Sequence, residues 1–540
     1  MPQPLGRGPA LRSRCARYDG PSPAASTRRV GAFVVALAAL FASSGPRTAD
    51  AAPPRPPAFV IDGDPNSLDT IRNTPFGWLL GPLTQGYLFL VDDRGRLVPD
   101  RALRVPTLPN GLIARDLRTI TYEIRTGRWS DGAPFDARDV AFTVAALRNP
   151  RTSVPDTSAV APIASVEVPR PDRLVVHLKR PFAPFVASFL TLGANDPFAI
   201  LPRHVAAAYA SLDRSSLDDH PIGLGPFRLA RWARGERLEF ERNPYAWRRA
   251  RSANVVVEIR PAAQTRLVEA LAHQLDAVPL TGLQIDAARG LATVAATTNI
   301  VDYLQMNVRR PALADARVRR ALAAAIDRRR LAATVYRAAL VPTDGVQYDP
   351  AFTATRALPR FDTAAAASVL RPLHLSLDLA IAGDWRRSAD AAVQIVDDLR
   401  RAGVTVAIRS FSEATFWGAK DAGGILEGGR YDLALTSWSP ALDPDRSYLF
   451  GCAATPPGGG NSMGWCSRAY DRDEAAGAST YDPSRRAAAY RAAGNVLVDD
   501  VPVIPLGLER SVYAVSPRLS GFRPNPLGRD FWNAWEWSVR

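Results

Sequence analysis

A strand–helix–strand pattern between residues 373 and 408 constrains the fold of this chain more than any other feature. Apolar residues occupy every second position from Leu373 to Ile381, which predicts a strand with one buried face and places His374 on its polar face. Apolar residues then recur at helical spacing from 392 to 399, and Gly403 supplies a helix stop. A second apolar run at 404–408 completes a βαβ unit, which is typical of an α/β fold.

Other segments agree with a mixed α/β chain. Residues 119–124, 174–178 and 431–437 are predicted as strands, and residues 139–147 as a short helix. Asp315 has the position of an N-cap for a helix that carries Val318 and Leu322 on one face. At about 150 residues per domain, 540 residues predict two to four domains. No apolar run approaches the roughly 18 residues that a membrane-spanning helix needs, which excludes an integral membrane protein.

The first fifty-one residues have the pattern of a cleaved secretory signal peptide. Arg28 and Arg29 precede an apolar stretch from Val30 to Ala42, and a small-x-small cleavage site follows at 49–51. The paired arginines leave Sec and twin-arginine export both open. No cysteine lies directly after the apolar stretch, where a lipid would be attached, so we expect no lipid anchor and a periplasmic protein.

The charge of the chain is basic and comes almost entirely from arginine. Lys179 and Lys420 are the only lysines among 67 basic residues, and the net charge is +14. Removing residues 1–51 takes away seven arginines and two aspartates, so the net charge falls to +9. The arginines at 317–330 alternate with apolar residues, which predicts a solvated helix face rather than a nucleic-acid site.

The two cysteines that remain after export are expected to form a disulfide. Cys452 and Cys466 lie in one Gly/Pro-rich loop, and an oxidising compartment favours pairing. Two cysteines and five scattered histidines make no metal-ligand cluster, so we expect neither a metal nor a cofactor.

Motifs that would indicate an enzyme fail on their context. Residues 460–464 fit G-x-S-x-G around Ser462, but that motif needs a strand before the serine, and residues 456–459 are Pro-Pro-Gly-Gly. Gly223-Leu224-Gly225 lacks the third glycine of a dinucleotide fingerprint. We therefore expect a protein that is not an enzyme.

A family resemblance is carried by one signature segment and six further blocks in register. The segment from Tyr122 to Phe142, with Trp129-Ser130-Asp131-Gly132 at its centre, resembles the signature of the family 5 extracellular solute-binding proteins, the oligopeptide- and dipeptide-type components of ABC importers. The remaining blocks lie at 64–69, 92–99, 223–247, 307–327, 431–438 and 500–506. The resemblance covers essentially all of the chain after residue 51.

The resemblance implies a two-lobed periplasmic binding protein, type II-like, with hinge strands and an additional inserted domain. The first lobe would take residues 52–95, 205–302 and 507–540, the inserted domain 96–204, and the second lobe 303–506. The hinge would lie near Asp302–Met306 and near residue 505. Such a protein closes around its ligand and works as a monomer that delivers it to a membrane permease.

The sequence departs from peptide-binding relatives at Ala441. In those relatives an aspartate at this position, three residues after the tryptophan that corresponds to Trp438, pairs with the free amino group of a peptide. Asp443 is the candidate replacement, because a buried ammonium needs a paired carboxylate; otherwise it only shapes a turn. Trp438, Trp417, Tyr303 and Asn307 are further candidate ligand contacts.

Three hypotheses follow for the function. The leading one is an importer protein that binds a peptide or peptide-like solute. The second is the same transport role for a non-peptide such as a sugar, an opine or a metal chelate, which Ala441 favours. The third is an exported enzyme or a ligand-presenting sensor.

Overall fold

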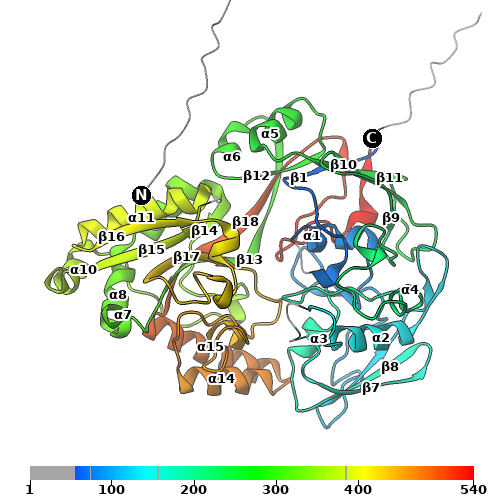
Figure 1. The fold of residues 1–540 in the computed structure, drawn as a ribbon, viewed down its shortest axis with the longest axis horizontal. Coiled ribbons are helices and arrows are strands. Elements are labelled where there is room, and N and C mark those ends of the chain that lie inside the picture. Colours follow the sequence, from blue (N-terminus) through cyan, green and yellow to red (C-terminus); the bar gives the residue numbers. More distant parts are fainter. Residues whose placement is uncertain (1–54, 73–74, 155–156, 158, 384–385) are drawn as a thin grey trace, which may run out of the picture. The chain divides into compact units, whose positions relative to one another are not determined.

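The computed structural model describes residues 55–72, 75–154, 157, 159–383 and 386–540 (Figure 1). The predicted signal peptide, residues 1–51, lies outside the described residues. Residues 54–540 form one compact unit. Among the described residues, no helix combines the length and the apolar character needed to cross a membrane.

One 11-stranded mixed sheet connects most of the strands of this unit. In spatial order its strands are β16 (Thr405–Phe411), β15 (Ser376–Ala382), β17 (Leu433–Trp438), β13 (Ala292–Met306), β18 (Val503–Val515), β12 (Ala277–Leu280), β1 (Ala58–Ile61), β11 (Asn254–Ile259), β10 (Arg237–Arg242) and β9 (Phe227–Ala233), with β14 (Leu340–Val341) also on β18.

The long strands β13 and β18 form the middle of this sheet. They pair antiparallel, and their register shifts between Thr297 and Val301 and again between Asp302 and Tyr303. Val301–Met306 of β13 also pairs with β17, whereas the other end of β18 pairs with β12. The predicted hinge segments therefore lie on the two strands that connect both halves of the sheet, and hinge motion there stays a prediction.

Smaller sheets and the helices complete the fold. The smaller sheets pair β2 (Phe89–Val91) with β3 (Leu97–Pro99), β4 (Thr119–Glu123) with β8 (Arg173–Leu178) and β7 (Ile163–Arg170), β5 (Gly127–Arg128) with β6 (Pro134–Phe135), and β19 (Leu519–Ser520) with β20 (Ser538–Val539). The helices are α1 (Pro75–Thr84), α2 (Ala137–Leu147), α3 (Phe185–Ser188), α4 (Arg203–Ala206), α5 (Ala263–Leu271), α6 (Leu283–Ala287), α7 (Pro311–Ala314), α8 (Ala316–Ala325), α9 (Arg328–Leu331), α10 (Thr363–Leu370), α11 (Arg386–Arg401), α12 (Glu413–Phe416), α13 (Ser447–Phe450), α14 (Arg468–Ala478) and α15 (Pro483–Asp500).

The predicted βαβ unit is present as β15, α11 and β16. The two strands are parallel, and Gly403 follows the helix with a φ of +90°, a conformation that favours glycine. The predicted start of the first strand is wrong, because residues 371–373 form a turn of 3-10 helix. His374 caps that turn in a left-handed conformation and is exposed, so it is solvated but not part of the strand.

The turn at Ser130 has a structural role. The Ser130 N–H donates to the carbonyl of Gly223 at 2.9 Å, and the Gly223 N–H donates to Ser130 Oγ at 3.2 Å. Gly223 and Gly225 also pass so close to the backbone at Thr84 that a Cβ atom at either position would overlap it. The adjoining helix α2 begins at Ala137, with Asp136 as its N-cap, two residues before the predicted start.

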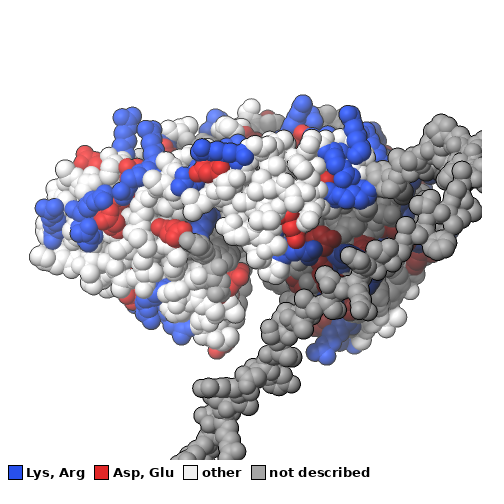
Figure 2. Space-filling view, turned by 90° about the horizontal axis from the view of Figure 1, so that it is seen from above, with Lys and Arg blue, Asp and Glu red and all other residues white. Residues whose placement is uncertain are grey.

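The arginines of α8 divide between solvent and interior. Asp315 caps α8 as predicted and accepts a hydrogen bond from the Arg317 N–H. Arg319 contradicts the prediction of a solvated face, because it is 4% exposed and its guanidinium donates to the carbonyls of Leu313 and Asp500. Figure 2 shows one face of the whole molecule, on which the basic side chains are dispersed with acidic side chains among them.

The described residues form several separate hydrophobic clusters. One cluster joins α8, α10, α11 and β15, and another joins β1, β10 and β11 with the C-terminal Trp537. A third surrounds β4, β8 and α2, but it also contains Phe89 and Leu224, which lie outside 96–204. The predicted domain limits therefore stay a prediction, and the core around the inserted domain extends past them.

Candidate functional site

Two pockets flank the loop that follows β17. The larger has a volume of about 660 Å³ and is lined by residues from distant parts of the chain, including Arg94, Asn299, Tyr348, Ala441 and Asp443. The smaller, of about 130 Å³, is lined by Phe182, Asp196, Trp438, Ala441 and Tyr448 among others. Ala441 and Asp443 line both pockets, so this loop separates them.

Strand β17 delivers Trp438 to the smaller pocket. Trp438 is the last residue of the strand and pairs with Val301 of β13. Its ring stacks on Tyr448, with the ring centroids 5.6 Å apart. The half-buried indole therefore presents an aromatic wall that apolar or planar groups can contact.

Asp443 is already paired within the protein. Its carboxylate accepts a hydrogen bond of 2.5 Å from Arg486 of α15, and each side chain is 11% exposed. Burial raises the pKa of Asp443, although the Arg486 guanidinium lowers it. The ion pair fixes the loop to α15 and neutralises the carboxylate that was the candidate partner for a ligand ammonium.

Arg446 holds the same loop from its other side. Its guanidinium donates to the carbonyls of Asp443, at 2.5 Å, and Asp445, at 3.1 Å. Its backbone N–H donates to Glu474 of α14, and burial raises the pKa of that glutamate well above its usual range. Arg446 therefore organises the turn at Pro444 as a buried cation.

The backbone before Asp443 is hydrogen-bonded to two distant segments of the chain. The Asn299 side-chain amide donates to the carbonyl of Pro440, and the Leu442 N–H donates to the carbonyl of Gly193 at 2.8 Å. Pro440 has no N–H. The groups that could hydrogen-bond an extended ligand along this loop are therefore few.

The other three predicted contacts lie away from both pockets. Tyr303 is 2% exposed within the core, and burial raises its pKa to about 12. Asn307 donates to the carbonyls of Gly429, at 3.0 Å, and Tyr431, at 3.1 Å. Trp417 is 37% exposed at the end of α12, with its ring against Phe416. The structure brings Trp438 and Asp443 together and leaves these three apart, so a ligand role for them stays a prediction.

Sequence reasoning missed Arg486 and Arg446. Arg446 follows Asp443-Pro444-Asp445, so an acidic turn next to an arginine was a local signal for it. Arg486 gave no such signal, because it lies 43 residues beyond the carboxylate that it pairs with.

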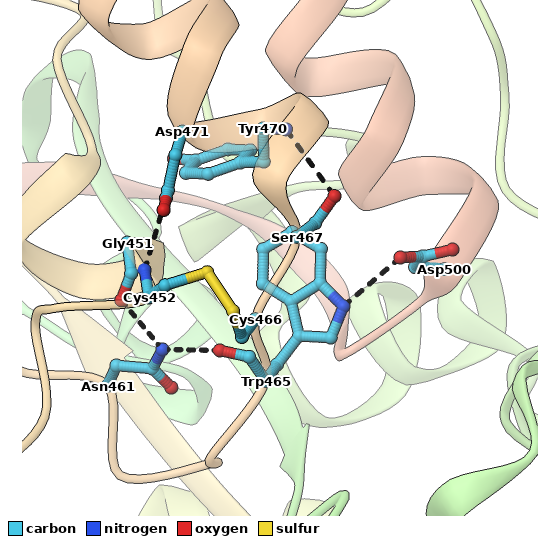
Figure 3. Close-up of a disulfide and its surroundings, with 9 residues drawn as sticks. All are labelled: Gly451, Cys452, Asn461, Trp465, Cys466, Ser467, Tyr470, Asp471 and Asp500. Atoms are coloured by element: carbon cyan, nitrogen blue, oxygen red, sulfur yellow. Dashed lines mark hydrogen bonds between the residues drawn. A yellow bond between two sulfur atoms is a disulfide. The ribbon is translucent and has the colours of Figure 1, made fainter.

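The disulfide loop is held by hydrogen bonds to Asp471 of α14 and Asp500 of α15 (Figure 3). Cys452 and Cys466 are joined in the structure. The Asn461 side-chain amide donates across the loop to the carbonyls of Gly451, at 3.0 Å, and Trp465, at 2.7 Å. Trp465 in turn donates to Asp500 at 3.2 Å. The disulfide and these hydrogen bonds thus fix the loop in place against α14 and α15.

Ser462 of this loop has no catalytic surroundings. It is 5% exposed, and its hydroxyl lies 3.1 Å from the amide of Gln305 and 3.3 Å from the hydroxyl of Tyr431. No histidine is among these partners. A group of three or more metal-ligating side chains is also absent from the part of the chain that the structure describes.

Comparison with known proteins agrees with the fold. The bacterial extracellular solute-binding proteins, family 5 Middle, match residues 109–459. The chain is 25% identical over 521 residues to di/tripeptide-binding protein 2 of Pseudomonas aeruginosa, covering 87% of this chain and 95% of that protein.

Solved structures share the two-lobed architecture. The oligopeptide-binding protein AppA from Bacillus subtilis, in complex with a nonapeptide, superposes with a TM-score of 0.75 at 18% identity, over 90% of this chain and 99% of that one. NikZ from Campylobacter jejuni, in complex with Ni(L-His), gives 0.76 at 19% identity, over 89% and 99%. With the match over residues 109–459, these likenesses establish that the chain belongs to the family 5 bacterial extracellular solute-binding proteins.

Proposed function

We propose that this chain is the substrate-binding component of an ABC importer, that it captures a peptide or peptide-like solute beside the loop 438–446, and that it delivers the solute to a membrane permease. The observation that carries the proposal is the pair of pockets that flank this loop, with Trp438 in the smaller one; the larger is a cavity of about 660 Å³, lined by residues as far apart as Arg94, Tyr348 and Leu527. This volume lies in the range of small-ligand sites. Proteins of this family bind peptides or small molecules and work with ABC permeases.

Relatives support a peptide or peptide-like ligand. The Pseudomonas aeruginosa relative is named for di- and tripeptides, and AppA was solved with a nonapeptide. We assign Trp438 as a ligand contact and Asp443 as a residue that shapes the loop. The family consists of transport components, and we propose that this member is likewise not an enzyme.

A non-peptide ligand is the second candidate, and the Asp443–Arg486 pair favours it. Ala441 offers no carboxylate, and the carboxylate of Asp443 already has a partner at 2.5 Å. At positions 441 and 443 a ligand ammonium would therefore find no carboxylate that is not already paired. NikZ, with the same fold, was solved with Ni(L-His).

Export and assembly complete the proposal. We propose that residues 1–51 are cleaved, that no lipid is attached, and that the protein works in the periplasm as a monomer without a cofactor. Dispersed arginines on a basic protein favour this role over nucleic-acid binding.

Mass spectrometry of the natively purified protein tests the proposal. We expect one bound solute per chain, of peptide or peptide-like mass. Trp438→Ala should lose that solute, whereas Trp417→Ala, a matched tryptophan away from both pockets, should keep it. Recovery of amine-free compounds only would replace the peptide by the second candidate. Equal retention by both variants would contradict a ligand role for Trp438.

A further inference from the structure

The turn between α14 and α15 contacts the segment that precedes α3. The Ala183 N–H donates to the carbonyl of Ala478 at 2.7 Å, and the Tyr481 hydroxyl lies 3.4 Å from the carbonyl of Phe182. Ala478 is the last residue of α14, whose final carbonyls have no partner inside the helix. A backbone N–H from the predicted inserted domain therefore completes a helix of the predicted second lobe.

Tyr481 strengthens this contact with its ring. The ring packs against the hydrophobic cluster around β4, β8 and α2, to which α14 and α15 do not belong. Burial raises the pKa of Tyr481 to about 12. The side chain of the α14–α15 turn thus packs against the hydrophobic core of the predicted inserted domain.

The same residues border the ligand pockets. Phe182 and Pro184, on either side of Ala183, line the smaller pocket. On the other side, Arg486 donates both to the carbonyl of Gly477, at 2.9 Å, and to the carboxylate of Asp443. The loop between the pockets is therefore connected through one guanidinium to the end of α14.

We propose that Phe182, Ala183, Ala478 and Tyr481 form a latch that holds the cleft closed and that must separate before a solute can leave. This inference rests on the proposed function. Contacts that exist only in the closed state shift the opening equilibrium toward that state, with or without a ligand. The latch thereby sets the residence time of a bound solute through residues that need not touch it.

Distance measurement by pulsed electron spin resonance tests the latch without a ligand. Spin labels are attached through Arg214→Cys and Lys420→Cys, two exposed positions in the predicted first and second lobes. We expect Tyr481→Ala to lower the ratio of closed to open molecules about tenfold, the effect of about 1.4 kcal/mol of lost contact free energy. Tyr481→Phe, which keeps the ring, should lower it less.

Tyr209→Ala is the matched control. Tyr209 packs against the same cluster as Tyr481. Its hydroxyl accepts a hydrogen bond from the Ser216 N–H, which lies outside the α14–α15 turn. It should leave the closed-to-open ratio unchanged. Identical distance distributions for Tyr481→Ala and the parent protein, both folded by circular dichroism, would overturn the latch. Because this measurement needs no solute, failure to find a solute by mass spectrometry would count against the proposed function alone.

Discussion

The carboxylate of Asp443 and the guanidinium of Arg486 form a buried ion pair, and its contribution to the free energy of unfolding depends on the presence of both partners. Removing one partner leaves the other as an unpaired buried charge, which costs about 3–5 kcal/mol, whereas replacing both by apolar groups is close to neutral. We therefore expect Asp443→Ala to destabilise the protein by about that amount and Asp443→Ala/Arg486→Met to recover most of it. Urea unfolding of the parent protein, Asp443→Ala, Arg486→Met and the double variant measures this coupling. Additive losses would mean that Asp443 has no structural partner in solution.

Individual side chains were the hardest part of this molecule to predict. Asn307 and Arg319 both lie in segments with a recognisable pattern, yet both donate to backbone carbonyls that local sequence does not specify. Arg319 makes this clear, because its neighbour Arg317 is exposed in the same helix. A helical pattern gives the face of a residue only approximately, and a partner such as Asp500 depends on how distant elements pack.

Elements with strong periodicity were predicted correctly in kind. The helical spacing in α11 and the apolar positions of β15 both mark the core that the two elements share, so that core is already visible in the sequence. The prediction of a single buried face for β15 is wrong, because Ala380 and Ala382 are buried in a second cluster on its other face. Their ends were less certain, because local turns decide them. At Arg371–Leu373 a turn of 3-10 helix displaces the first predicted strand residues.

The packing of α14 against α15 depends on a glycine that no pattern indicated. A Cβ atom at Gly477 would lie 2.7 Å from the ring of Tyr490. We expect Gly477→Ala to destabilise the protein by about 1–3 kcal/mol, because a stiff ring and two helices must move apart. Thermal unfolding measures the loss. Gly458→Ala, where the nearest atom is 3.6 Å away, should have no comparable effect, and equal stability of both variants would contradict close packing at Gly477.

At the scale of the whole molecule, the central sheet connects the two lobes that the sequence resemblance predicts as separate parts. β13 and β18 carry hydrogen bonds to β17 on one side and β12 on the other, so both halves of the sheet share the same two strands. The order of strands in this sheet could not be read from periodicity, because periodicity reports burial and not neighbours. The family resemblance supplied the two-lobed plan instead.

Removal of bound solute gives the last prediction, because a ligand that binds only the folded protein stabilises the whole molecule. At a concentration of 100 times Kd the gain is about 2.7 kcal/mol, which for a chain of this size corresponds to roughly 3 °C in Tm. Protein stripped by unfolding and refolding, with its disulfide kept intact, should therefore melt at a lower temperature than natively purified protein. Adding back the solute extract should restore the original Tm. Equal melting temperatures before and after stripping, in a sample whose mass spectrum shows a bound solute, would mean that the solute is not held by the folded cleft.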